Sequence, residues 1–144
     1  MIDNRSAPYA ATLLRLTLGV AFLAHAGLKI FVFTPAGTAH FFESVGVPGF
    51  AAYLDILAEV VGGLALIAGV YTRIVALVLT PILIGAIITV HGHNGFFFNN
   101  ANGGWEYPAF WIAALIVQAL LGDGAYAAGS LRGSGAPGNV VAAR

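Results

Sequence analysis

The sequence contains no cysteine and has few charged residues. Without cysteine, the 144-residue chain has no disulfide, no thiolate metal site and no dithiol redox relay of its own. Asp, Glu, Lys and Arg make up 8% of the residues, whereas a typical soluble domain is about a quarter charged. The net charge is zero, so nothing in the charge balance indicates a nucleic-acid partner. Hydrophobic residues supply 59% of the chain, a balance typical of integral membrane proteins.

Four apolar segments are long enough to cross a bilayer, which takes about 20 helical residues each. Turn-forming stretches such as TPAGT at 34–38 separate these segments. The pattern predicts an all-α fold, an integral membrane four-helix bundle over residues 1–132, followed by a flexible C-terminal tail at 133–144. The predicted spans are Leu13–Phe33, Phe50–Val70, Ile74–Val90 and Tyr107–Ala127.

The distribution of basic residues predicts how the chain lies in the membrane. Cytoplasmic ends of membrane helices carry an excess of Lys and Arg. With the N-terminus inside, only Lys29 falls towards the outer side. We therefore expect both termini in the cytoplasm and the lipid bilayer around the helices. The basic residues on or near the inner side are then Arg5, Arg15, Arg73, Arg132 and Arg144.

Two pairs of ionisable residues interrupt the first two apolar segments. His25 and Lys29 are four residues apart, as are Asp55 and Glu59, so each pair lies on one face of its helix. At 1.5 Å per residue, Lys29 lies about 6 Å and His25 about 12 Å from the outer end of the first helix. Asp55 and Glu59 lie about 8 Å and 13 Å deep on the antiparallel second helix. Because an unpaired charge at such depth costs roughly 2.5–3.5 kcal/mol, we expect the two pairs to face each other.

Further ionisable residues lie at the same side of the predicted bundle. His91 and His93 end the third segment, and Glu106 begins the fourth. Intramembrane ionisable residues usually mark a functional site. We therefore expect a polar pocket in the outer half of the bundle, opening outward between the first three helices. Its seven candidate ligand-binding residues are His25, Lys29, Asp55, Glu59, His91, His93 and Glu106.

The histidines raise two alternatives to a simple polar pocket. His91-x-His93 together with Glu59 or Glu106 offers the nitrogen and oxygen ligands that zinc, copper or iron accept, but this spacing is common in loops. A haem between His25 and His91 would need ligands that differ in depth by roughly 12 Å. The sequence therefore favours a site without a metal and leaves His91 and His93 as the candidate metal ligands.

A smaller set of charges lies at the opposite end of the predicted bundle. Arg15 and Asp123 are each about 5 Å from the predicted cytoplasmic boundary. Paired charges in such positions often serve packing or orientation rather than chemistry. We therefore expect a structural ion pair that ties the first helix to the fourth.

Glycines and charged residues recur in a set of distinctive motifs. In AEVVGGLALIAGVYTR at 58–73, an acidic residue is followed by a glycine pair, a third glycine and Thr-Arg. Together with RLTLGVAFLAHAGLKI at 15–30, FFESVGVP at 41–48 and ALLGDGAYAAGSL at 119–131, this stretch resembles the DoxX family of small bacterial membrane proteins. The resemblance covers about residues 10–132. The Ser-Leu-Asp in which the family pattern often ends is here Ser-Leu-Arg, so any role of that acid is absent.

The resemblance implies a four-helix protein of the bacterial inner membrane with a link to membrane redox complexes or oxidative-stress defence. On this basis we interpret the chain as a quinone-associated component, a candidate subunit of a quinone-linked oxidoreductase. Lys29 or His25 would donate to a quinone carbonyl, and Glu59 would carry protons. Because the chain has no cysteine and no haem or flavin motif, a redox partner subunit or the quinone would have to supply the redox chemistry. The alternative is a non-enzymatic scaffold or carrier for a small ligand or for partner proteins, and either interpretation leaves room for a homo-oligomer.

Overall fold

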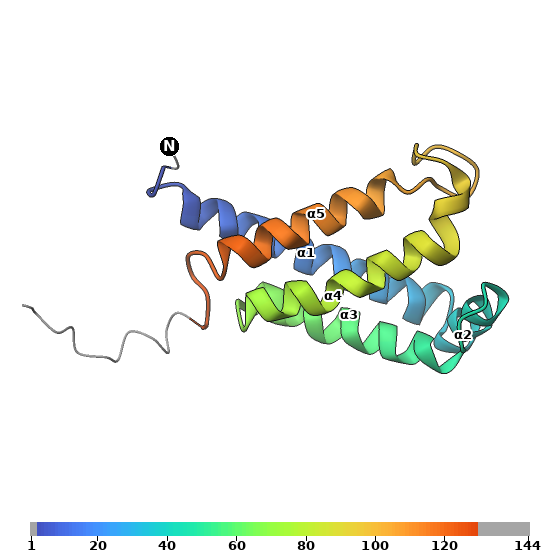
Figure 1. Ribbon diagram of the computed structural model, residues 1–144. Helices are drawn as coiled ribbons and strands as arrows, with labels where there is room; N and C mark the ends of the chain where they lie inside the picture. The colour runs from blue at the N-terminus through green and yellow to red at the C-terminus, as the bar shows by residue number, and fades with distance from the viewer. Residues whose placement is uncertain (1–2, 130–144) are drawn as a thin grey trace, which may run out of the picture.

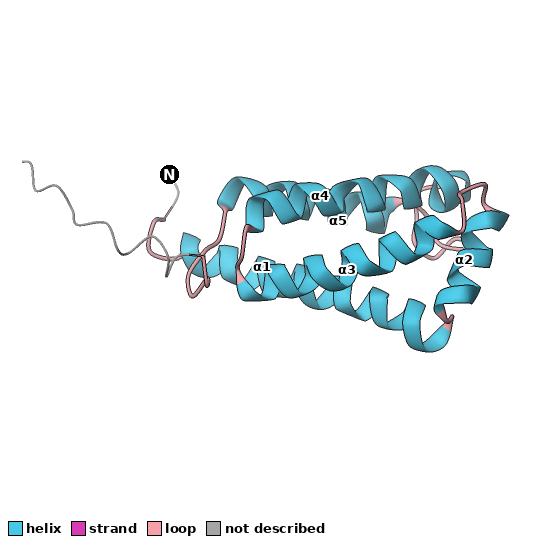
Figure 2. Cartoon of the chain, turned by 90° about the horizontal axis from the view of Figure 1, so that it is seen from below, coloured by secondary structure: helices cyan, strands magenta, loops and turns pink. Residues whose placement is uncertain are grey.

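Four long helices run lengthwise along one another, and one short helix lies at one end of them (Figures 1 and 2). The computed structural model describes residues 3–129, and the part of the chain within these limits contains no strand. The predicted tail at 133–144 lies outside the described residues. The helices are α1 (Ala7–Gly27), α2 (Pro35–Ser44), α3 (Phe50–Ala68), α4 (Thr72–Ala86) and α5 (Glu106–Leu121).

Three helical segments are long and apolar enough to cross a membrane, namely Ala7–Val32, Phe50–Ala68 and Thr72–Asn94. The predicted all-helical membrane fold is therefore confirmed. The fourth apolar helix, α5, has 16 residues and ends at Leu121, six residues before the predicted end of the last span. It ends there because Gly122 adopts a positive φ of 85°, and the Gln118 side chain donates a hydrogen bond of 2.7 Å to the Gly122 carbonyl.

Two of the spans change their helical winding at the end of the bundle where α2 lies. α1 continues as a π-helical turn, η1 (Leu28–Val32), and α4 continues as a second one, η2 (Ile87–His91). A short 3₁₀ turn, η3 (Gly92–Asn94), follows η2. π-Helical turns occur frequently at functional sites. Both of them here carry an ionisable residue that the sequence analysis selected, Lys29 in η1 and His91 in η2.

The short helix α2 was not predicted from the sequence, which had indicated only a turn at 34–38. Thr34, with a positive φ of 63°, redirects the chain after η1. Its side-chain oxygen then accepts a 3.1 Å hydrogen bond from the Gly37 N–H, and Pro35 begins the helix, so the turn residues form a helix start. α2 packs against α3 and covers one end of the bundle.

The interior of the bundle contains a closed layer of apolar side chains from all four long helices. α1 packs most extensively on α3, and α4 packs most extensively on α5. Glycine allows the first of these contacts to be close, because a Cβ atom on Gly19 would lie 2.8 Å from the Gly63 carbonyl oxygen. The side chains of the apolar layer are at most 4% exposed and belong to Leu18, Phe22, Leu66, Leu79 and Leu115.

Candidate functional site

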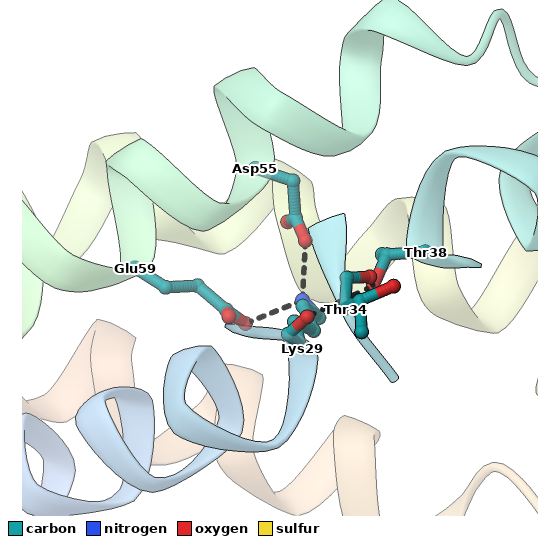
Figure 3. Close-up of polar contacts among 5 residues, drawn as sticks. All are labelled: Lys29, Thr34, Thr38, Asp55 and Glu59. Atoms are coloured by element: carbon teal, nitrogen blue, oxygen red, sulfur yellow. Dashed lines mark hydrogen bonds and ion pairs between the residues drawn. The ribbon is translucent and has the colours of Figure 1, made fainter. Parts of the chain in front are cut away.

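The side chain of Lys29 lies between two carboxylates of α3 (Figure 3). Its Nζ atom is 2.9 Å from Oε1 of Glu59 and also forms an ion pair with Oδ2 of Asp55. Asp55 and Glu59 are one helical turn apart, so they present their carboxylates on the same face of α3. The predicted meeting of oppositely charged residues on the first two spans is therefore confirmed for these three side chains.

The backbone around Lys29 is held in place by α2. The Thr38 hydroxyl, on the first turn of α2, lies 2.9 Å from the Thr34 carbonyl oxygen and 3.3 Å from the Lys29 carbonyl oxygen (Figure 3). Thr38 is only 4% exposed, so this contact lies in the interior. It connects the start of α2 to the π-helical turn and thereby fixes where the Lys29 side chain leaves the backbone.

The charges of this cluster do not balance when all three groups are ionised. One ammonium faces two carboxylates, and Glu59 is 3% exposed. Its second oxygen, Oε2, has no hydrogen-bond partner among residues 3–129. A buried carboxylate oxygen without a hydrogen-bond partner costs folding free energy. A bound proton, a water molecule or a hydrogen-bond donor of a ligand would remove this cost at Oε2.

A second buried polar atom without a partner belongs to Trp111 on α5. The indole is 6% exposed, and its Nε1–H donates to no other group in the described part of the chain. The rings of Phe22 and His25 hold it in place, with centroids 4.8 Å and 5.0 Å from the indole centroid. Buried tryptophan N–H groups usually have a partner, so Trp111 offers a free donor that is rigidly positioned.

Both of these atoms belong to residues that line a single cavity of about 990 Å³. Apolar side chains form most of its wall, including Phe41 and Phe42 of α2. On α4 the wall contains Gly85. Apart from its own helical turn, nothing in the described chain lies within 4 Å of the position that a Cβ atom on Gly85 would take, so there is open space at this residue. The histidine, lysine and acidic side chains in the lining are His25, Lys29, Asp55, Glu59 and His91. Five of the seven predicted candidates thus lie around one cavity.

The remaining two predicted candidates lie elsewhere. Glu106 accepts a 3.0 Å hydrogen bond from the Phe98 backbone N–H and lines a separate cavity of about 390 Å³. His93 is exposed and follows η2. His91 lines the large cavity and places Nδ1 3.0 Å from the Gly103 carbonyl oxygen. Within residues 3–129, no three His, Asp or Glu side chains are grouped so that they could hold a metal ion.

Trp111 was not predicted from the sequence as a site residue, and Arg15 makes buried contacts that the sequence did not indicate. Trp111 lies four residues before Leu115 and seven before Gln118, on the buried face of α5, and this helical periodicity was the available signal that it faces the interior. The predicted ion pair between Arg15 and Asp123 is not among the ion pairs of the described residues. Arg15 is 1% exposed and donates instead from Nη1 to the carbonyls of Leu66 (2.7 Å) and Ile67 (2.6 Å), near the end of α3.

Comparisons with known proteins agree with the motifs found in the sequence. The sequence model of the DoxX family matches residues 10–92, more than half of the chain. A protein of Bacillus subtilis (strain 168) with the name "Putative oxidoreductase CatD" is 42% identical over 87 residues. The matched region covers 60% of this chain and 63% of the Bacillus protein, so the similarity spans less than two thirds of that relative. No solved structure matches the chain significantly.

Proposed function

Because the chain belongs to the DoxX family, we propose that it is a quinone-associated component of a membrane redox system. The quinone ring would lie in the cavity beside Lys29, Glu59 and Trp111. The observation that carries this proposal is the pair of buried atoms without partners, one acceptor (Glu59 Oε2) and one donor (Trp111 Nε1–H), in the same apolar cavity. A ligand that both accepts and donates hydrogen bonds would satisfy both atoms.

The hydrogen-bonding groups of the cavity fit a quinone and its reduced form. A quinone ring carries two carbonyl acceptors, which become hydroxyl donors when the ring takes up two electrons and two protons. Trp111 Nε1–H and the Lys29 ammonium are donors for the carbonyls. Glu59 Oε2 can accept a hydrogen bond from a hydroxyl or, when protonated, give a proton to a ring oxygen. The three side chains therefore match both oxidation states.

Within this proposal Lys29 and Asp55 keep the Glu59 carboxylate in position. The ion pairs fix the Lys29 ammonium between the two acids, so Oε1 of Glu59 is held and Oε2 is left for the ligand. His91 lies in the same cavity at the end near α2. An imidazole can both accept and donate a proton, so His91 would connect Glu59 with water at that end.

Electrons would come from another protein. The chain has no cysteine, and nothing in its sequence matches a haem or flavin motif, so its proposed role is to bind the quinone and handle protons. The name of the Bacillus relative refers to an oxidoreductase, which supports a redox setting. We propose a partner subunit that donates electrons to the bound quinone.

We further propose that the protein crosses the bacterial inner membrane several times with its N-terminus in the cytoplasm. Arg5, Arg15 and Arg73 lie towards the end of the bundle where α1 and α4 begin, whereas Lys29 lies towards the end with α2. The excess of basic residues on the cytoplasmic side favours this orientation. The cavity then opens in the outer half of the membrane.

Binding of decylubiquinone or a menaquinone analogue tests the proposal directly. Quinones quench tryptophan fluorescence at short range, so the Trp105→Phe variant in nanodiscs reports on Trp111 in the cavity. We expect saturable quenching, weakened in Glu59→Gln and unchanged in Glu43→Gln, which alters an exposed carboxylate of α2. Absence of saturable quenching, or equal affinity in Glu59→Gln, would remove the quinone assignment.

Turnover distinguishes the redox role from a scaffold or carrier. With electrons supplied by co-purified partner proteins, quinone reduction should be slower in Glu59→Gln than in the wild type. Stable partners that co-purify without any reduction of added quinone would instead support the non-enzymatic alternative.

A further inference from the structure

Some residues of the large cavity are also exposed on the outside of the bundle. Leu54 of α3 is 58% exposed and Val78 of α4 is 61% exposed, yet both line the cavity that contains Glu59. A residue that faces both the cavity and the exterior marks an opening, and the cavity has a second set of such residues nearer its α2 end, namely Phe41, Phe98 and Tyr107. Because Leu54 and Val78 are apolar and belong to membrane-spanning helices, the opening beside them faces lipid rather than water.

The opening has the form of a slot along the seam between α3 and α4. A Cβ atom on Gly62 would lie 2.8 Å from the Leu79 side chain, which places these two residues at the same level of the antiparallel pair. Val78 is next to Leu79, and Leu54 lies eight residues before Gly62 on α3. At 1.5 Å per residue the two ends of the slot are about 12 Å apart along the bundle. Figure 1 shows α3 and α4 separating towards α2.

Inside the bundle, the slot leads into the cavity only in the direction of α2. Towards the beginning of α1, the layer of Leu18, Phe22, Leu66, Leu79 and Leu115 closes the bundle. Towards α2, the cavity runs past Ala58 and the open space at Gly85 to the Lys29 and Glu59 cluster. An apolar opening that leads to a polar end of the cavity fits a molecule with a hydrogen-bonding ring and a flexible apolar tail.

The geometry points to sideways entry from the lipid phase: the ligand passes through the slot between α3 and α4, its ring reaches Lys29 and Glu59, and its tail stays in the slot. This inference rests on the proposed function for the identity of the ring and adds the route and the class of ligand. The ligand is a lipid-dissolved molecule with a tail, and a tailless, water-soluble quinone would lack the contacts with the slot.

The slot itself can be tested without any quinone. The Trp105→Phe protein is reconstituted in phosphatidylcholine that carries bromine in its acyl chains, which quenches tryptophan on contact. If acyl chains reach into the slot, the fluorescence of Trp111 is quenched although this residue is 6% exposed. We expect Leu54→Phe/Val78→Phe to reduce this quenching. The matched control is Leu57→Phe/Leu77→Phe, because these residues lie on the same helices with similar exposures of 59% and 57% but outside the cavity lining.

Stopped-flow quenching by decylubiquinone then tests the route of the ligand. Larger side chains at the slot should slow association by roughly threefold or more, because they narrow the route by which the ligand enters. The control pair should keep wild-type rates. Unchanged rates in Leu54→Phe/Val78→Phe would overturn sideways entry, as would unquenched Trp111 in brominated lipid. Bromine quenching without saturable quinone quenching would contradict the proposed function and leave a lipid tail as the occupant of the slot.

Discussion

The ammonium of Lys29 on the first span lies 2.9 Å from Oε1 of Glu59 on the second, while the other oxygen of Glu59 has no partner in the described chain. One cation therefore serves two carboxylates, since Asp55 contacts the same ammonium. Each carboxylate therefore depends on Lys29 for its counter-charge, whereas either carboxylate alone would neutralise the Lys29 ammonium.

Removal of Lys29 should destabilise the protein more than removal of the whole cluster. Lys29→Met leaves two adjacent buried carboxylates without a cation, which costs about 3–5 kcal/mol. The triple variant Lys29→Met/Asp55→Asn/Glu59→Gln removes all three charges and should recover most of that loss. Thermal unfolding in detergent measures both. The exposed pair His40 and Glu43 is the control, and Glu43→Gln should change the free energy of unfolding by less than about 1 kcal/mol.

Filling the cavity at Gly85 should abolish ligand binding without harming the fold. Gly85→Leu puts a side chain into open space and replaces a glycine inside a helix, which by itself favours folding by about 0.5–1 kcal/mol. Quinone quenching of Trp111 should disappear while the melting temperature stays the same or rises. Gly27→Leu is the matched control, because Gly27 also has open space at its Cβ position but lies outside the cavity lining. Equal quinone affinity in Gly85→Leu and Gly27→Leu would contradict this placement of the ligand.

Replacement of Trp111 by phenylalanine should separate its ligand role from its packing role. The ring contacts with Phe22 and His25 are largely kept, and the lost Nε1–H has no partner in residues 3–129, so stability should change little. One lost hydrogen bond to the ligand weakens binding by roughly tenfold. Equilibrium dialysis of labelled decylubiquinone measures this effect without tryptophan fluorescence. A large fall in stability with unchanged affinity would show that the indole only packs.

Arg15 and Asp123 should respond differently to substitution. Arg15→Met removes two hydrogen bonds from a buried guanidinium to the carbonyls of Leu66 and Ile67, at a cost of about 3 kcal/mol. Asp123→Asn should cost less than about 1 kcal/mol, since the two side chains form no ion pair in the described structure. Equal losses in the two variants, with no further loss in the double variant, would restore the ion pair predicted from the sequence.

The contact between α1 and α3 should tolerate no side chain at Gly63. A Cβ atom there would lie 3.0 Å from the Gly19 carbonyl oxygen and 2.9 Å from Leu23, so Gly63→Ala forces the two helices apart at a cost of about 1–3 kcal/mol. Gly85→Ala, in open space, is the control and should not destabilise. Circular dichroism melts of the two variants in the same detergent provide the comparison.

The charged cluster could be predicted from the sequence because depth in a membrane follows directly from residue number. Lys29, Asp55 and Glu59 fall at similar depths on consecutive helices, and the cost of an unpaired charge in lipid makes their pairing strongly favourable. The same reasoning could not fix lateral positions. Arg15 and Asp123 were paired by depth, and this pairing stays a prediction, whereas the hydrogen bonds from the guanidinium to carbonyls of α3 could not be foreseen.

The features missed by the sequence analysis depend on local chain geometry. α2 follows from the positive φ of Thr34 and its cap on Gly37, and TPAGT alone reads as a turn. The aromatic residues near the fourth span are typical of a membrane interface, yet Trp111 lies inside the bundle, on the buried face of α5 that also carries Leu115 and Gln118. The cavity depends on both features, so its shape could not be predicted from periodicity.

The apolar layer also forms a low-dielectric barrier to charged groups and protons. Its side chains are those of Leu18, Phe22, Leu66, Leu79 and Leu115. Charge crosses such a low-dielectric barrier only at great cost, so in the proposed redox role Glu59 would exchange protons with the compartment on the α2 side of the layer. Turnover in sealed vesicles would then change the pH of that compartment first.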